Sequence, residues 1–328
     1  MALAATTLVV AALVSPSRHA QAALPARLLS APVGELRARI DHDAASAAKV
    51  LSPDAREAYL ASLRRFYDWV DAYCGVPDSL QGLGGDASRC VQNEYFNYLA
   101  RIPASVYRVG GLTIYETGVY ALQWADDNLQ GADPQRPFLW TLSVIWPRVD
   151  ASPGPMLRPF LRGLADEVRE SQSDWVKSGW VSDVDVHIET VNACYASASI
   201  TASTYSGGAH PYESFLAFNW DQGARRPLTV ATLFRTGSDW QRGLLALYRK
   251  HLASIPDPPQ GTPIPDADLA LWVTNDAVVT DAGLKIIEHE GRYRSESIPA
   301  VEIPWSELAA WMRPPASCAA RQASPLPR

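Results

Sequence analysis

Apolar residues change their spacing about a third of the way along the chain. Before residue 103 they recur every three or four residues, as at Tyr59, Leu63, Phe66 and Val70, and this period predicts helices with one buried face. From residue 107 onward, apolar and polar residues mostly alternate, which is the pattern of half-buried strands. The chain is therefore predicted to contain a helical unit followed by a unit built mainly of strands.

The helical unit is predicted over residues 52–103 as a hairpin of two helices. Ser52-Pro53-Asp54 has the composition of a helix start: a capping serine, a proline at the first position and an acid near the positive end of the helix dipole. The first helix should end near Tyr73, and the second should cover about residues 87–101. Residues 23–51 are predicted to be a linker.

The strand-rich unit is predicted over residues 107–313, followed by a loose tail over residues 314–328. Residues 183–190 alternate apolar and polar side chains, which predicts an antiparallel strand whose polar face meets water. Residues 269–274 and 284–288 are further predicted strands. A helix that carries Leu157, Leu161, Leu164 and Val168 should begin at Pro159 or later, because proline breaks a helix interior. Antiparallel strands with two or three packed helices, without regular strand-helix-strand alternation, indicate the α+β class.

A loop between two predicted strands, inside residues 200–228, carries the candidate binding residues. Ser206-Gly207-Gly208 can adopt positive φ angles and Pro211 restricts the exit, so the loop presents His210 in a defined conformation. Aromatic side chains precede and follow it. The predicted binding set is Tyr205, Gly207, Gly208, His210, Tyr212 and Trp220. For the three aromatic residues, packing between strands is an equally good interpretation.

Composition and the first residues indicate an exported globular protein. A net charge of −6 offers no basic stripe for phosphates, so we expect no nucleic-acid partner. Residues 1–22 combine an apolar run with the small-x-small sequence Ala20-Gln21-Ala22, which predicts a signal peptide cleaved after Ala22 and a periplasmic or secreted location. The alternative is a buried helix. After cleavage we expect no membrane-spanning segment.

Four cysteines follow the predicted cleavage site, and an even number in an exported chain indicates disulfide bonds. Three pairings are possible. Cys74 with Cys90 closes the shortest loop, which is rich in glycine, and by elimination Cys194 then pairs with Cys318.

Residues 139–311 resemble the RsiV-type domain. The resemblance lies in Tyr205-Ser206-Gly207-Gly208-Ala209-His210, the following Asn219-Trp220-Asp221, and the later Pro227-Leu228-Thr229. That domain occurs in a lysozyme-sensing anti-sigma factor and beside the catalytic domain of some peptidoglycan deacetylases, and its role is mostly undefined. Residues 52–101 are similar to the closing part of the LprI family, some of whose members are described as lysozyme inhibitors. These resemblances imply a lysozyme-like enzyme or peptidoglycan as the partner.

Catalytic motifs are weak in this sequence. A hydrolase would have to use His210, with Tyr205, Glu213 or Asp221 as its partner, but a single loop histidine without a nucleophile more often bonds the backbone. His187 and Glu189 could hold a metal with His289 and Glu290, although a solvated strand face is the better interpretation. We therefore assign no catalytic residue, metal site or cofactor.

The sequence thus favours a non-catalytic, exported cell-envelope binding protein. Eleven tryptophans and thirteen tyrosines exceed what a core of this size needs, and the surplus could line a glycan-binding or protein-binding surface. The ligand would be a lysozyme-like muramidase, which the protein would recognise or inhibit, or peptidoglycan. The alternative is an envelope hydrolase that acts on peptidoglycan or another glycan through the His210 loop.

Overall fold

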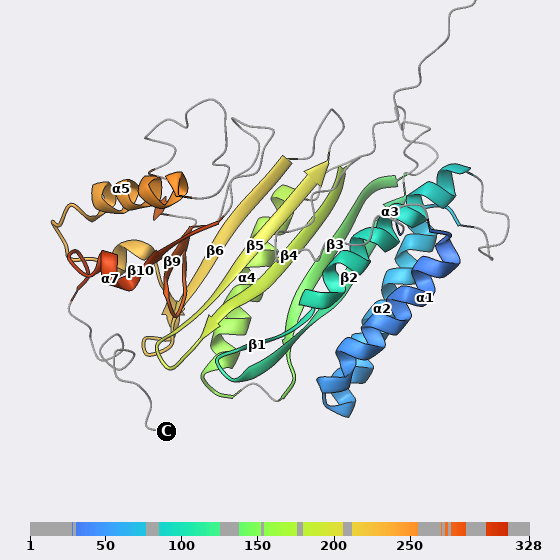
Figure 1. Ribbon diagram of the computed structural model, residues 1–328, viewed down its shortest axis with the longest axis horizontal. Coiled ribbons are helices and arrows are strands. Elements are labelled where there is room, and N and C mark those ends of the chain that lie inside the picture. The colour runs from blue at the N-terminus through green and yellow to red at the C-terminus, as the bar shows by residue number, and fades with distance from the viewer. Residues whose placement is uncertain are drawn as a thin grey trace, which may run out of the picture.

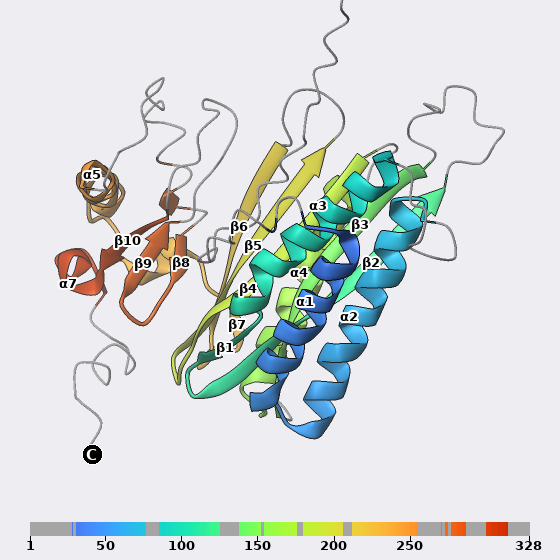
Figure 2. The same ribbon diagram turned by 45° about the vertical axis from the view of Figure 1, so that its right-hand side comes forward.

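A seven-stranded sheet forms the centre of the computed structural model, and helices lie on both of its faces (Figure 1). The structure describes residues 28, 31–76, 85–124, 138–151, 154–175, 180–205, 212–254, 270, 273–274, 277–286 and 300–313. Helix α4 (Leu157–Trp175) covers one face of the sheet. Helices α1 (Val33–Ala47), α2 (Pro53–Tyr73) and α3 (Gly85–Arg101) lie together on the side of the other face (Figure 2). The α+β class predicted from the sequence is confirmed.

Helix α2 begins and buries its apolar face as its sequence predicts. The Ser52 hydroxyl accepts a hydrogen bond from the backbone N–H of Ala55 at 3.4 Å, which satisfies one of the unpaired donors of the first turn. The buried face comprises Tyr59, Leu63, Phe66 and Val70, each 4% exposed or less. This face packs into a cluster with residues of α1 and α3.

Helix α1 lies in the segment for which we expected a linker. Its buried residues Leu36, Ile40 and Ala44 are spaced four apart, so they lie along one side of the helix and enter the same cluster as α2. A 3-10 turn, η2 (Ala48–Val50), then leads to α2. The amino-terminal unit is therefore a layer of three helices and not only a hairpin.

The strands follow one another in the sheet in the order of the chain. They are β1 (Val106–Val109), β2 (Leu112–Trp124), β3 (Phe138–Val149), β4 (Trp180–Val191), β5 (Tyr195–Tyr205), β6 (Tyr212–Asp221) and β7 (Arg226–Pro227). Gly110 and Gly111, with φ of 55° and 81°, form the two-residue turn between β1 and β2. A 3-10 turn, η3 (Ile102–Ala104), connects α3 to β1.

One strand pair is parallel in a sheet that is otherwise antiparallel. Strand β4 pairs with β5 in antiparallel fashion but with β3 in parallel, and α4 makes the crossover between β3 and β4. The helix begins at Leu157, two residues before Pro159. Proline is tolerated there because the first turn has no backbone N–H bond to lose. The sheet is therefore mainly, but not wholly, antiparallel.

Alternation along the strands separates an apolar face from a polar one. On β4, Val184, Val186 and Ile188 are buried against α4, together with Phe218 and Trp220 of β6. Asp183, Asp185 and His187 point to the opposite face, toward the side of the three helices. That face is half-buried, so the expectation that it meets water is wrong. The amino-terminal helices cover part of it.

A smaller sheet of three strands packs beside the end of β6. It consists of β8 (Ala277–Val279), β9 (Gly283–Ile286) and β10 (Val301–Pro304), and it shares a core with α5 (Trp240–Ala253), α7 (Trp305–Leu308) and the 3-10 turn η4 (Val230–Leu233). Asn219 of β6 joins the two sheets: its amide nitrogen donates to the Ala277 carbonyl at 2.9 Å, and its amide oxygen accepts from the Val279 N–H at 2.8 Å.

Two local expectations for this region have different outcomes. The predicted strand over residues 284–288 corresponds to β9. The predicted strand over residues 269–274 is wrong where the structure describes it, because residues 270, 273 and 274 are helical, and the Thr274 hydroxyl donates to the Ala270 carbonyl one helical turn earlier.

The disulfide predicted for the helical unit is present. Cys74 and Cys90 are bonded and join the end of α2 to the start of α3. Cys194 is buried and also disulfide-bonded, whereas its predicted partner, Cys318, lies outside the described residues. Residues 1–22, the predicted signal peptide, lie outside them too. Within the described ranges, no helix has both the length and the apolar character needed to span a bilayer.

Candidate functional site

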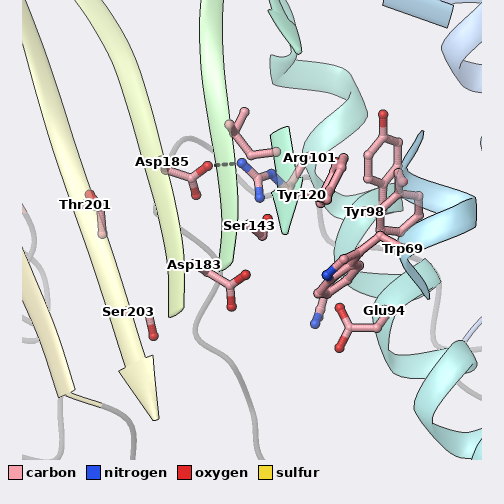
Figure 3. A pocket seen from close by; sticks show the side chains of 13 residues that line it. Trp69, Glu94, Tyr98, Arg101, Tyr120, Ser143, Asp183, Asp185, Thr201 and Ser203 are labelled. Atoms are coloured by element: carbon pink, nitrogen blue, oxygen red, sulfur yellow. Dashed lines mark hydrogen bonds and ion pairs between the residues drawn. The ribbon is translucent and has the colours of Figure 1, made fainter. Parts of the chain in front are cut away.

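A pocket lies at the seam between helix α3 and the polar face of the sheet (Figure 3). We call it the α3 pocket. Its volume of about 60 Å³ is enough for about four to six water-sized groups. Its charged lining residues are Glu94, Arg101, Asp183 and Asp185, its rings are Phe66, Trp69, Tyr98 and Tyr120, and its remaining lining residues are Asn97, Ser143, Ile145, Thr201 and Ser203.

The helix side of the pocket follows from the helical period. Glu94, Asn97, Tyr98 and Arg101 lie three, four and seven residues apart, so all four project from the same side of α3. The buried residues Val91, Tyr95 and Leu99 face the helical cluster. A polar stripe on α3 is thereby directed at the sheet instead of at solvent.

The sheet side of the pocket follows from the strand register. Tyr120 of β2, Ser143 of β3, Asp183 of β4 and Ser203 of β5 are aligned in one row across four strands. The neighbouring row contains Ile145, Asp185 and Thr201. Because alternate residues of a strand share a face, two adjacent rows form a continuous polar floor.

Arg101 and Asp185 form an ion pair across the pocket, from α3 to β4 (Figure 3). Their side chains are 24% and 17% exposed, so water screens the pair less than it would a surface pair. Arg101 is the one basic residue among the described residues of the lining. The described lining therefore contains three carboxyl groups and one guanidinium, which is paired with Asp185 and lowers the pKa of Asp183.

The other two carboxyl groups, Glu94 and Asp183, have raised pKa values. Loss of water, together with a smaller effect of the negative charge of Asp183, raises the pKa of Glu94 to about 8. Burial also raises the pKa of Asp183, to about 6, although Arg101 and a hydrogen bond from Ser143 oppose this shift. No hydrogen bond or ion pair joins the Glu94 carboxyl to another residue within the described ranges. Both carboxyl groups therefore keep their protons to higher pH than ordinary carboxyl side chains do.

Aromatic rings form the wall between the helices and the sheet. Phe66 and Tyr98 are stacked with ring centroids 4.1 Å apart, and Trp69 and Tyr120 lie 5.5 Å apart. The Trp69 indole N–H donates to Thr141 at 3.1 Å, so only its ring is available to a ligand. The Tyr120 hydroxyl lies over Gly118, where a Cβ atom would be 2.1 Å away, and it has no hydrogen-bond partner in the described part of the chain. Burial raises the pKa of the Tyr98 and Tyr120 hydroxyl groups, so both stay protonated and can donate hydrogen bonds.

Most of the loop that we predicted to bind a ligand lies outside the described residues. Gly207, Gly208 and His210 lie outside the described residues, as do the side chains of Tyr205 and Tyr212. Tyr205 ends β5 and Tyr212 begins β6, so the loop connects two antiparallel neighbours as expected. The α3 pocket and this loop lie toward the same end of β5, because Ser203 lines the pocket.

Trp220 is a core residue rather than a binding residue. It occupies the opposite end of β6 from the loop, is 6% exposed, and packs against α4, where Gly163 leaves room for its ring. The period of two puts Trp220 on the same face as Phe218, which is also buried. The alternative of strand packing therefore holds for Trp220.

His187 and Glu189, the two described residues among those considered as metal ligands, have other partners. His187 stacks on Tyr107 with ring centroids 4.2 Å apart, and its Nδ1 atom lies 3.8 Å from a Glu116 carboxyl oxygen. The Glu189 carboxylate accepts hydrogen bonds from the Lys285 ammonium and the Ser199 hydroxyl, both at 2.8 Å. His289 and Glu290 lie outside the described residues. No group of three or more potential metal ligands occurs among the residues that were placed.

The α3 pocket is not evident from the sequence patterns alone. Its signals were present: two acids alternate with apolar residues at positions 183–186, and polar residues recur at helical spacing from Glu94 to Arg101. Each pattern alone predicts a solvated face. Only the packing of the helical layer on the sheet brings the two faces together.

Comparison with known proteins adds only distant likenesses. No protein-family model and no curated protein matches the chain. Its structural neighbours are DUF3298 family proteins, a family of unknown function. One, from Pseudomonas aeruginosa PAO1, has a TM-score of 0.41 and 16% identity over 62% of this chain and 95% of its own. A second, from Bacteroides fragilis, has a TM-score of 0.40 and 13% identity over 63% of this chain and 96% of its own.

Proposed function

We propose that the protein is a non-catalytic binding protein of the cell envelope, exported by its signal peptide, and that the α3 pocket is its ligand site. The observation that carries the proposal is that polar groups lining the pocket have no partner within the described chain. These are the Glu94 carboxyl and the Tyr120 hydroxyl. Buried polar groups are normally hydrogen-bonded, and an unpaired one in a cavity is available to a ligand.

The lining residues suit binding by stacking and hydrogen bonding. Trp69, Tyr98 and Tyr120 supply ring surfaces, while Asn97, Thr201 and Ser203 supply donors and acceptors around them. Rings with polar groups at their edges form the usual surfaces for sugars and for protein side chains. Among the described residues, the lining contains no histidine and no cysteine.

The candidate ligands come from the RsiV-type and LprI resemblances in the sequence. They are a lysozyme-like muramidase, which the protein would recognise or inhibit, and peptidoglycan itself. The loop with Gly207, Gly208, His210 and the flanking Tyr205 and Tyr212 stays a proposed second contact, because Ser203 of the pocket precedes it by only a few residues.

The test is retention of the mature protein on immobilised lysozyme and on purified peptidoglycan. We expect Glu94→Gln and Asn97→Ala to reduce retention at least tenfold without lowering the melting temperature, because both residues are partly exposed in the pocket. Glu57→Gln, on the exposed side of α2, is the matched control. Equal retention of all three variants would exclude the α3 pocket as the site, and no retention of the wild-type protein on either material would exclude both ligands.

A second candidate function, glycan hydrolysis, is favoured by the carboxyl pair. Glycosidases use two carboxyl groups, one of which stays protonated at working pH to act as the general acid. Glu94, with a pKa of about 8, would be the carboxyl group that stays protonated, and Asp183, with a pKa of about 6, would be the second carboxyl group. Release of reducing ends from peptidoglycan by the wild-type protein, lost in Glu94→Gln, would establish hydrolysis and end the non-catalytic proposal.

A further inference from the structure

The charges in the α3 pocket do not balance. Glu94, Asp183 and Asp185 supply three carboxyl groups, and Arg101 supplies one positive charge. Arg101 donates to Asp185, so that pair is satisfied within the protein. Asp183 receives only the hydrogen bond from Ser143, and Glu94 receives none from a described residue. The described lining therefore has more carboxyl groups than positive charges, and a cation would offset part of that excess.

The aromatic rings that line the pocket also favour a positively charged group. A cation is attracted to the face of Trp, Tyr or Phe, and three such rings, Trp69, Tyr98 and Tyr120, line this pocket. Because the Trp69 N–H is already bonded to Thr141, the indole offers its π system and not its donor. An anionic group would instead be repelled by the carboxyl groups of Glu94 and Asp183.

Size restricts the group to a side-chain terminus. Room for about four to six water-sized groups matches a guanidinium, or an ammonium with its last methylene groups. A net charge of −6 on the whole chain also attracts a basic partner during encounter.

We infer that the α3 pocket binds a guanidinium or ammonium group of the ligand, held between the Glu94 and Asp183 carboxyl groups and the surrounding rings. The inference rests on the proposed function, because it specifies the chemistry of the same site. Two sources share this chemistry: a basic side chain of a protein partner, and the free amino groups of peptidoglycan stem peptides.

Affinity should depend on pH because the bound cation replaces a proton. The charged and titratable groups around the Glu94 carboxyl are Asp183 and Asp185 from β4, Arg101 and Tyr98 from α3, and Tyr120 from β2. Helix α2 contributes the rings of Phe66 and Trp69 to the lining, and its Arg65 acts electrostatically on Tyr120. Of these, Glu94 and Asp183 titrate between pH 5 and 9. Lowering the pH through this range protonates both, so binding must weaken at acid pH.

The test uses ethylguanidinium chloride as the probe, with N-ethylurea as its neutral counterpart of the same shape. Both are titrated into the intact mature protein at constant ionic strength, and the Trp69 indole signal is followed by NMR. We expect a saturable shift with ethylguanidinium only, an affinity at least tenfold lower at pH 5 than at pH 9, and at least a tenfold loss in Glu94→Gln. Asp183→Asn is the second pocket variant, and Glu57→Gln should match the wild-type protein.

Several results would overturn the inference. They are the absence of a saturable shift, equal affinity for N-ethylurea, or unchanged affinity in both pocket variants. If the variants do not fold, the comparison of the two probes on the wild-type protein decides the matter alone. Retention on lysozyme or peptidoglycan without ethylguanidinium binding would reject the cation site while leaving the proposed function intact.

The source of the cation is found by competition. Displacement of the protein from lysozyme by ethylguanidinium, with no effect on peptidoglycan, would assign the group to a basic side chain of a protein. Displacement from peptidoglycan would assign it to the stem-peptide amines. n-Butylammonium, tested in parallel, shows whether the pocket prefers an ammonium to a guanidinium.

Discussion

The indole N–H of Trp69 donates a hydrogen bond to the hydroxyl of Thr141 at 3.1 Å, across 72 residues of chain. Trp69 lies on α2 and Thr141 on β3, so this contact joins the helical layer to the sheet. Both residues are buried, at 8% and 1% exposure. The Thr141 hydroxyl in turn donates to the Ala121 carbonyl at 3.3 Å. The pocket wall formed by Trp69 is thereby held in place by the sheet.

Replacing Thr141 with valine keeps the volume and removes this acceptor. The indole N–H would then be buried without a partner, and the free energy of unfolding should fall by about 1–3 kcal/mol. The change is measured by denaturant unfolding. Thr229→Val, at an exposed position, is the control and should be nearly neutral. A Thr141→Val variant as stable as the wild-type protein would show that this contact does not hold the two layers together.

The disulfide should also stabilise the helical layer. Cys74 and Cys90 close a loop between α2 and α3, and replacing both with serine should lower stability by about 3 kcal/mol through the added entropy of the unfolded chain. The melting temperature measures the effect. An unchanged value would mean that the connection between α2 and α3 is fixed without this bond.

Local features of the fold could be read from the sequence because they depend on neighbouring residues. The Ser52 cap, the buried face of α2 and the short disulfide loop each depend on residues close in the chain. Helix α1 carries the same kind of signal, since Leu36, Ile40 and Ala44 share one side of it. Polar residues surround these three positions, and we therefore expected a linker there. The period and spacing of apolar residues therefore predicted the fold class but missed helix α1.

The pocket could not be read in the same way because it depends on packing between distant segments. Arg101 and Asp185 are 84 residues apart, and nothing in either local pattern indicates that α3 lies over β4. Asp183 and Asp185 on an alternating strand predict a solvated face unless another layer covers them. Conversely, Trp220 was placed beside the loop by its sequence position, although it lies at the far end of β6 under α4.

Stability should fall as pH rises, through Glu94. In the folded protein its pKa is about 8, whereas in the unfolded chain a glutamate titrates near its ordinary value of about 4.3. Between these values the folded state holds more protons, so the free energy of unfolding decreases with increasing pH. We expect Glu94→Gln, which has no charge to bury, to melt higher than the wild-type protein at pH 8.5 and close to it at pH 5. Parallel melting curves across this range would contradict the raised pKa, and Glu57→Gln should follow the wild-type curve.

The Arg101–Asp185 ion pair should contribute more to the free energy of unfolding than the surface ion pairs of this protein do. Because its side chains are mostly buried, removing one partner leaves the other charge without compensation. Arg101→Gln should therefore reduce the free energy of unfolding by about 1–3 kcal/mol. A double-mutant cycle with Asp185→Asn should give a coupling of about 1 kcal/mol or more. The matched cycle on Arg169 and Asp166, which are 70% and 55% exposed, should give less than about 1 kcal/mol; equal couplings in the two cycles would show that burial does not strengthen the pocket pair.

Gly163 tests how closely α4 packs on the sheet. A Cβ atom there would lie 2.8 Å from the Trp220 ring and 3.1 Å from the Phe218 ring, and both rings are buried. Alanine raises helix propensity by up to about 1 kcal/mol over glycine, but forcing a methyl group into a filled core typically destabilises by about 1–3 kcal/mol. We expect the clash to dominate and Gly163→Ala to lower the melting temperature. Gly154→Ala, which meets no atom within 4 Å, is the control and should be nearly neutral. A Gly163→Ala variant more stable than the wild-type protein would show that Trp220 can move aside, and that helix propensity outweighs the contact between α4 and β6.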